Sequence, residues 1–272
     1  MVKKNGEASS RSARNAEESK KNSGSNPTHD QTLPSIYSFT EQADESYLHV
    51  REQLSKAERA RLRLQRDYIL FKMCLRSEQL WIIYLMASLS ILFGYYSVDV
   101  FKTFGQSVPE LSDDRYLTWV GSMAALFNAA RFIWSACLDH YSYKEVYGVL
   151  LLLQIFLAAT MSFAIKSKAF YLSWICLALL CEGGHFTLVP NILKKIFGRQ
   201  ATSLYGVAFS YTGLTSLLMI GLLEAFAESY LLFYALTAVF SLLSLLLLHR
   251  SFSEVPFTPD QKQLVAELRQ TW

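Results

Sequence analysis

The residue whose type and position most suggest binding chemistry is Arg131, which stands in the otherwise apolar stretch NAARFIWSAC. An arginine near the centre of a membrane helix costs about 2.5–3.5 kcal/mol on insertion scales, so it usually faces a bundle interior or a water-filled path. Its planar guanidinium can hold a carboxylate through two parallel hydrogen bonds. Arg131 is therefore a candidate anion-binding residue. In the structural alternative, it reaches the inner membrane interface or pairs with a carboxylate on another helix.

Glu182 and His185 form a second candidate group, because residues three apart share one face of a helix. A carboxyl group and an imidazole both exchange protons, and histidine titrates near physiological pH, so the pair is a candidate for proton coupling. The same stretch contains Gly183, Gly184 and Pro190, which favour close helix packing and a kink. In that alternative, Glu182 only satisfies free backbone groups.

Asp139 and Lys144 flank a short turn that follows the stretch around Arg131. An aspartate at such a turn can accept hydrogen bonds from the exposed amides at the amino terminus of a neighbouring helix, which would lock one conformation. The alternative is an ordinary acidic residue at the membrane interface.

The sequence offers no constellation for catalysis or metal binding. It contains no GxSxG, HExxH or Walker sequence, and its cysteines form no CxxC pair and have no histidine at ligand spacing. The net charge of +3 is small, and no basic stripe alternates with regularly placed aromatic residues, as nucleic-acid binding requires. We therefore predict no enzyme, no cofactor, no metal and no nucleic-acid partner, and we expect packing roles for Cys74, Cys137, Cys176 and Cys181.

The elements that must position these residues are membrane helices. Hydrophobic residues make up 51% of the chain, and they are concentrated after residue 78 in long runs with short polar breaks. A transmembrane helix needs about 20 mainly apolar residues. Six segments meet this requirement, and we predict one span in each of them: 79–98, 116–138, 146–165, 169–193, 204–226 and 229–248.

The amino-terminal part of the chain is polar. Residues 1–54 are rich in Ser, Asn, Lys and Glu, a composition that cannot bury enough apolar surface to become ordered, so we predict a disordered cytoplasmic tail. Ser55 to Glu58 has the form of a capping box and strong helix formers follow it, which predicts a basic juxtamembrane helix over 55–77. This helix either lies on anionic lipid, at roughly 1 kcal/mol per basic residue, or stays solvated.

The distribution of Lys and Arg predicts an orientation. The segment before the first span is basic, and the connection after the fourth carries Lys194, Lys195 and Arg199. The first long loop is acidic. The positive-inside rule then places both termini in the cytoplasm, including a short tail over 251–272. Lys166 and Lys168 argue weakly against this arrangement, because they would lie outside.

Several strings resemble one family of transporters. FKTFGQ, followed by NAARFIW with Asp139 and Lys144, resembles the seventh and eighth helices of major-facilitator transporters of the oxalate/formate antiporter and monocarboxylate type. Residues 190–206 resemble the connection between their tenth and eleventh helices. The resemblance covers about residues 79–250. It implies an all-α membrane protein with a major-facilitator half-bundle of six transmembrane helices.

The resemblance also implies substrate residues. Arg131 stands at the position of an arginine that binds the substrate carboxylate, and Asn128, Tyr211 and Thr212 are further candidate substrate-binding residues. Oxalate-type members carry a lysine in the eleventh helix, after a stretch like YGVAFSY, where this chain has Thr212. With a single cationic residue on the path, a monocarboxylate is favoured over a dicarboxylate.

Asp139 and Lys144 resemble the loop motif with which this family latches its cytoplasmic side closed. Ser135 replaces the usual glycine, and His140 replaces a basic arginine, so the resemblance implies a weaker latch.

The sequence therefore predicts transport of a small organic anion by a rocker-switch mechanism, with this chain supplying the carboxy-terminal half as a fragment or subunit. The expected partners are the anion, the lipid bilayer, protons, and a second six-helix half from the same chain upstream, a separate chain or a second copy. The alternative is a non-transporting membrane adaptor or regulator, which keeps the fold while its disordered tail recruits partners.

Overall fold

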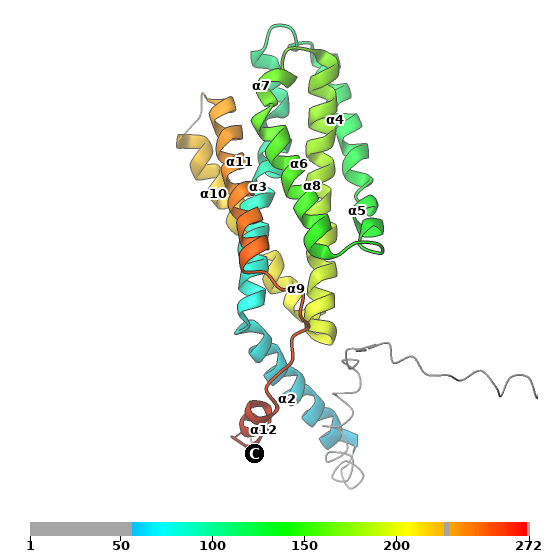
Figure 1. Ribbon diagram of the computed structural model, residues 1–272, viewed down its shortest axis with the longest axis vertical. Helices are drawn as coiled ribbons and strands as arrows, with labels where there is room; N and C mark the ends of the chain where they lie inside the picture. The colour runs from blue at the N-terminus through cyan, green and yellow to red at the C-terminus, as the bar shows by residue number, and fades with distance from the viewer. Residues whose placement is uncertain (1–55, 226–228, 271–272) are drawn as a thin grey trace, which may run out of the picture. The chain divides into compact units, whose positions relative to one another are not determined.

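A computed structural model describes residues 56–225 and 229–270 of the 272-residue chain. Within these ranges every regular element is helical, as expected (Figure 1). The predicted disordered tail over 1–54 and Ser55 of the predicted capping box lie outside the described residues. In chain order the elements are α2 (Lys56–Leu75), α3 (Glu78–Ser107), α4 (Asp114–Ala129), α5 (Phe132–Cys137), α6 (Tyr143–Ala159), α7 (Met161–Ala164), α8 (Lys168–Phe197), η2 (Gly198–Gln200), α9 (Ala201–Phe209), α10 (Tyr211–Ala225), α11 (Tyr230–Arg250) and α12 (Gln261–Gln270).

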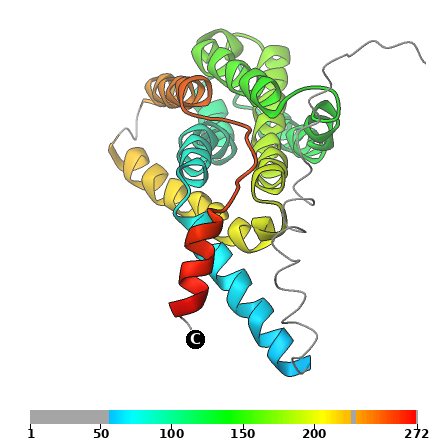
Figure 2. The same ribbon diagram turned by 60° about the horizontal axis from the view of Figure 1, so that its bottom comes forward.

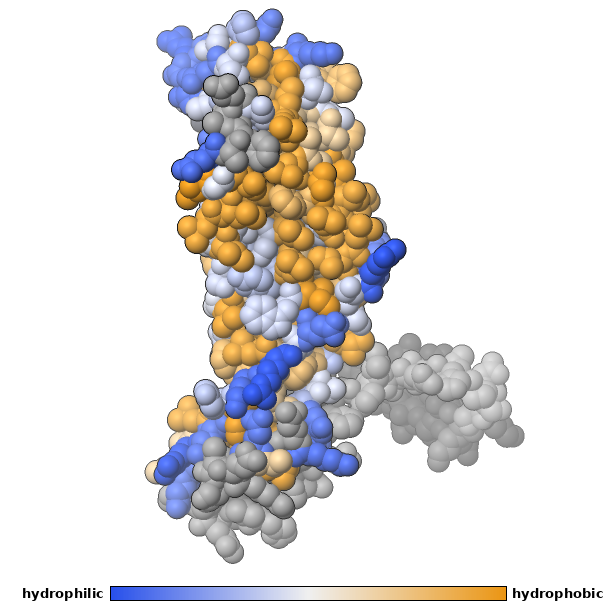
Figure 3. Space-filling view, turned by 90° about the vertical axis from the view of Figure 1, so that its left-hand side faces the viewer, coloured by the Kyte–Doolittle hydropathy of each residue, from blue (hydrophilic) through white to orange (hydrophobic). Residues whose placement is uncertain are grey.

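Three helical segments in the described part of the chain are long and apolar enough to cross a membrane. They are α3, the run Lys168–Glu224 that leads from α8 into α10, and α11. Exposed leucine, isoleucine and valine side chains cover α10 and α11. In Figure 3 an apolar belt lies between hydrophilic ends of the bundle. A lipid-facing surface has this distribution, because hydrocarbon solvates apolar side chains and excludes charge.

The predicted spans coincide with helices, but several of these are interrupted. α4 and α5 are separated at Ala130, α6 and α7 at Thr160, and α9 and α10 at Ser210. The structure therefore does not show six continuous spans. A count of apolar residues cannot detect such interruptions, because it measures the hydropathy of a segment and not the course of its backbone.

The first predicted loop is another difference, since α3 continues to Ser107 and so includes most of it. Gly105 does not end this helix. A Cβ at Gly105 would meet the end of the Leu117 side chain of α4, so the two helices lie in close contact at this glycine.

α3 and α8 are the central helices of the bundle. α3 packs against α8, α10 and α11, while α8 also packs against α4 and α6. Aromatic rings fill the contact between α3 and α11, where Tyr96 stacks on Phe233 with ring centroids 3.9 Å apart. Figure 2 shows α3 from its lower end, with these neighbours around it.

Helices α2 and α12 lie at the lower end of the bundle in Figure 1. α2 lies within the range predicted for the juxtamembrane helix, and its Ile69 and Met73 pack on Leu268 of α12. Arg76 and Glu267 form an ion pair across the same contact at 3.7 Å. α12 lies within the predicted tail over 251–272, and its ten residues are too few for hydropathy to distinguish a helix there.

Candidate functional site

Arg131 lies at the interruption between α4 and α5. Its backbone amide donates to the carbonyl oxygen of Asn128 at 3.2 Å, which closes the turn that ends α4. The Arg131 side chain is exposed. Among the described residues, its guanidinium, which carries five N–H donors, makes no hydrogen bond and no ion pair.

Asn128 connects this interruption to α8. Its side-chain nitrogen Nδ2 donates to Oε2 of Glu182 at 2.7 Å. Glu182 is only 9% exposed, so its carboxylate needs such a donor. Asp99 of α3 and Arg131 also lie close enough to Glu182 to interact with it electrostatically. We call these four residues from three parts of the bundle, Asp99, Asn128, Arg131 and Glu182, the polar cluster.

Two glycines allow the helices to approach at this cluster. A Cβ at Gly183 would lie 2.8 Å from the carbonyl oxygen of Asn128 and 2.9 Å from Cβ of Arg131. A Cβ at Gly94 would lie 2.8 Å from Cβ of Glu182. Real Cβ atoms essentially never approach so closely, so each site requires glycine for this geometry. The close helix packing predicted for Gly183 is confirmed.

A second anchor holds α5 on α8. The indole nitrogen of Trp134 donates to the carbonyl oxygen of Leu180 at 2.9 Å. Gly184 accommodates the ring, because a Cβ there would lie 3.0 Å from Cδ1 of Trp134. Arg131 is thus flanked by two contacts to α8, one from Asn128 before it and one from Trp134 after it.

His185 does not join Glu182 in a shared site. It is fully buried, with Nδ1 3.3 Å from the Tyr147 hydroxyl and Nε2 2.9 Å from the side-chain amide nitrogen of Gln154. Residues three apart differ by about 60° around a helix axis. Because α4 and α6 pack against different faces of α8, that angle directs Glu182 toward α4 and His185 toward α6. The structure therefore gives the two proposed proton carriers separate partners.

The two remaining candidate substrate residues lie on α10. Tyr211 is fully buried, its ring meets that of Tyr84 edge-on at 6.3 Å, and its hydroxyl has no hydrogen-bond partner among the described residues. Thr212 is half-buried and donates to the carbonyl oxygen of Phe209 at 2.9 Å. Arg131 and Asn128 lie together at the polar cluster, and Thr212 is connected to it through Tyr95, which interacts with Thr212 and with Glu182.

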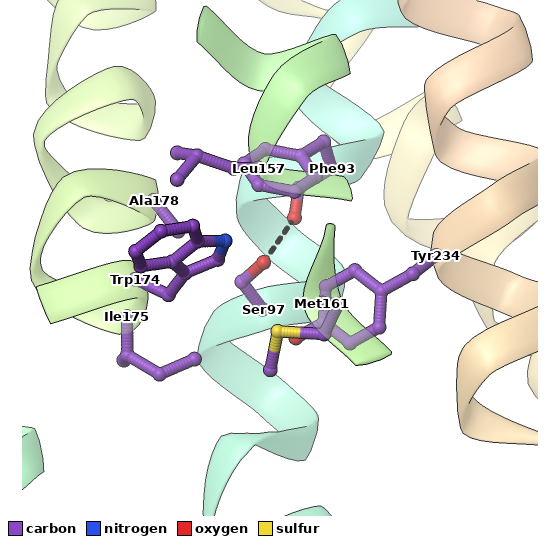
Figure 4. A pocket seen from close by; sticks show the side chains of 8 residues that line it. All are labelled: Phe93, Ser97, Leu157, Met161, Trp174, Ile175, Ala178 and Tyr234. Carbon is purple, nitrogen blue, oxygen red and sulfur yellow. Dashed lines mark hydrogen bonds between the residues drawn. The ribbon is translucent and has the colours of Figure 1, made fainter. Parts of the chain in front are cut away.

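A small pocket inside the bundle is unsuited to an anion. It is too small to hold a water molecule and is lined by side chains from α3, α6, α7, α8 and α11 (Figure 4). Its walls are mainly apolar and contain no charged side chain, and the Ser97 hydroxyl already donates to the carbonyl oxygen of Phe93 at 2.8 Å. The polar cluster at Arg131 is therefore the better candidate site.

Glu254, in the segment after α11, contacts Lys144 of α6 and Lys195 of α8. We call these three residues the tail clasp. One oxygen of Glu254 accepts from the backbone amide of Lys144 at 2.7 Å, and the other accepts from Nζ of Lys195 at 2.6 Å. Nζ of Lys144 donates to the carbonyl oxygen of His249 at 3.1 Å. Glu254 thus joins the start of α6 to the end of α8, and Lys144 joins α6 to the end of α11.

Two opposing effects act on Glu254. Partial burial favours its neutral form, but the hydrogen bonds from Lys195 and the Lys144 amide outweigh burial, so the pKa of Glu254 lies below its ordinary value. The carboxylate is therefore ionised in the clasp at neutral pH.

The acidic residue of the tail clasp differs from the one predicted for the latch. Asp139 is exposed, and in the described part of the chain its side chain has no hydrogen bond or ion pair. The role predicted for Asp139, accepting from amides at a helix amino terminus, belongs here to Glu254. Lys144 takes part, but through the tail and α11. The sequence contained one signal for this role, because Glu254 is the only acidic residue between positions 229 and 259.

No protein-family model matches this chain, and neither does any curated protein. The resemblance of the sequence to major-facilitator transporters stays a prediction, and the function must be argued from the polar cluster and the tail clasp.

Proposed function

We propose that this chain supplies one half of a membrane transporter for a small organic anion, and that Arg131 binds the anion's carboxylate. One observation carries the proposal. The Arg131 guanidinium is exposed and unpaired within the described residues, although it lies in an apolar segment at a helix interruption. A charged group in such a segment is costly, and it is typically retained where it lines a substrate path.

The helical arrangement supports a half-transporter. Three of the described helical segments, α3, the run Lys168–Glu224 and α11, are long and apolar enough to span a membrane, and α4, α5, α6 and α7 lie beside them as interrupted helices. Interrupted helices at membrane depth are tolerated where they line a cavity or pack against protein, and transporters place their substrate sites at such interruptions. A second six-helix half then covers the polar cluster, and rocking of the two halves exposes it to each side in turn.

The charge at the site favours a monocarboxylate. Arg131 is the cationic residue of the cluster, and Glu182 and Asp99 are acidic, so a second carboxylate on the ligand meets no further cation among the described cluster residues. The guanidinium matches one carboxylate through two parallel hydrogen bonds.

The tail clasp has a mechanical role in this proposal. It ties the inner ends of α6, α8 and α11, with both termini on the cytoplasmic side, so that these helices move as one body during rocking. Substrate specificity then resides at Arg131, while Glu254 maintains the shape of the half.

Uptake of a labelled monocarboxylate such as lactate into vesicles containing the chain tests this proposal. Arg131→Gln should lower kcat/KM about 100-fold, which corresponds to the loss of a charge-assisted pair of hydrogen bonds. Arg115→Gln is a matched control, because Arg115 is an exposed arginine at the other end of α4. Uptake that is unchanged in Arg131→Gln would remove Arg131 from the site. No uptake by the parent chain would favour the adaptor role.

A further inference from the structure

We propose that Glu182 is a positioning residue, which acts through Asn128 to hold the α4–α5 interruption so that Arg131 faces the substrate. This inference rests on the proposed function, because it concerns how the same anion site is built. Glu182 itself does not bind the anion.

The first step is the link from Glu182 to Arg131. The carboxylate of Glu182 fixes the side chain of Asn128 at 2.7 Å, and the carbonyl oxygen of Asn128 accepts from the Arg131 amide at 3.2 Å. Asn128 therefore bonds α8 with its side chain and Arg131 with its backbone. A shift of Asn128 away from α8 must move the turn that carries the guanidinium.

The second step is that the interruption needs external support. α5 contains only Phe132–Cys137, too short to be stable by itself, and α4 ends at Ala129. Trp134 anchors α5 on Leu180 after Arg131, and Asn128 anchors α4 on Glu182 before it. Both anchors lie on α8, so the position of Arg131 is set relative to one rigid helix.

The third step concerns what Glu182 must supply. Its side chain is enclosed between α3 and α8, since a Cβ at Gly94 would lie 2.9 Å from Cγ of Glu182. The contact to Asn128 needs an acceptor oxygen at this place, and the amide oxygen of a glutamine can supply one without the charge of the carboxylate. A residue that carries protons, by contrast, must be ionisable. Glutamine and leucine at position 182 therefore distinguish positioning from proton coupling.

Two readouts test the proposal: the KM for labelled lactate uptake, and the acetate concentration that half-protects Arg131 from phenylglyoxal, located by mass spectrometry. Glu182→Leu should raise both about tenfold, with a smaller change in kcat, since one charge-assisted hydrogen bond is lost. Glu182→Gln should stay within about threefold of the parent chain, because the acceptor is kept and only its charge is lost. Ser173→Ala, an exposed position on α8, is the matched control.

The partner residue gives a second test. Asn128→Ala should reproduce the effect of Glu182→Leu, and the double variant should be no worse than either single variant, because both remove the same contact. If Glu182→Leu does not fold, Asn128→Ala tests the same contact in its place. Additive effects in the double variant would contradict a shared role.

The outcomes separate this inference from the proposed function. A Glu182→Gln variant as defective as Glu182→Leu would overturn positioning and would assign the role to the ionisable group. Arg131-dependent uptake that is insensitive to Glu182→Leu would overturn only the positioning role. The proposed function would also be overturned if acetate did not protect Arg131 in the parent chain and if Arg131→Gln left uptake unchanged.

Discussion

Glu182 and Glu254 each join two helices through a carboxylate, but their partners differ. Glu182 is 9% exposed and accepts from a neutral side-chain amide. The Glu254 side chain is 20% exposed and accepts from an ammonium group and a backbone amide. At the polar cluster the nearby cation, Arg131, has no ion pair with any residue in 56–225 or 229–270, whereas in the tail clasp Lys195 pairs directly with Glu254. A binding site must keep its charge available, and a clasp has no such requirement.

Of the substitutions that probe the polar cluster and the tail clasp, Gly183→Ala should lower the free energy of unfolding most, because it forces the helices apart at the polar cluster. The new methyl group would lie 2.8 Å from a backbone oxygen and 2.9 Å from Cβ of Arg131. Overpacking of this kind costs about 1–3 kcal/mol. We expect a lower free energy of unfolding, measured by denaturant titration in detergent, and a loss of uptake.

Gly206→Ala is the matched control, because a Cβ there has no atom within 4 Å. In a helix this substitution should be neutral or should stabilise the chain by about 0.5–1 kcal/mol. Equal destabilisation by the two alanines would mean that the close approach at Gly183 is not needed.

A smaller effect is expected from Glu254→Gln in the tail clasp. Loss of the charge-assisted bonds at this partly exposed site should cost about 1–2 kcal/mol at neutral pH. Because folding lowers the pKa of Glu254, its contribution is complete above the ordinary value of 4.5 and is lost as the pH falls through the folded value. The unfolding free energies of the two proteins should therefore converge in acid.

Glu110→Gln, in the exposed connection after α3, controls for the general effect of removing a carboxylate. A difference between the parent chain and Glu254→Gln that grows as the pH falls below 4.5 would be inconsistent with the direction of this pKa shift.

The smallest effect is expected from Asp139→Asn. The side chain is exposed, and substitutions at such positions usually change stability by no more than about 0.5 kcal/mol. The same denaturant titration measures it. A decrease in the free energy of unfolding as large as that of Glu254→Gln would instead support Asp139 as the latch residue.

The sequence predicted the features that depend on local composition. Runs of apolar residues located the helices, and the cost of a charge in such a run singled out Arg131. It could not predict the bond between Asn128 and Glu182, because these residues are 54 positions apart and meet only through the packing of α4 on α8. The same limit explains why helical spacing pairs Glu182 with His185. Their side chains contact different helices, because Glu182 bonds Asn128 of α4 and His185 lies against α6.

Glu254 was missed for a related reason. Neither hydropathy nor residue spacing shows that the segment after α11 returns to the bundle, where the Phe257 amide donates to the carbonyl oxygen of Ile196 at 2.8 Å. This depends on tertiary contacts with the end of α8. The interruption at Ala130 was missed because the sequence around it favours a continuous helix as strongly as a broken one.

The course of that segment bears on where the domain ends. A chain shortened after Arg250 would keep every long apolar helix of the described part, and a hydropathy plot would show it as intact. It would nevertheless lack the acceptor at the start of α6, the partner of Lys195 and the helix that covers α2. The boundary of this folding unit therefore lies beyond its last membrane-length helix, and a protease that cuts between residues 251 and 260 should loosen the bundle without removing any part of that helix.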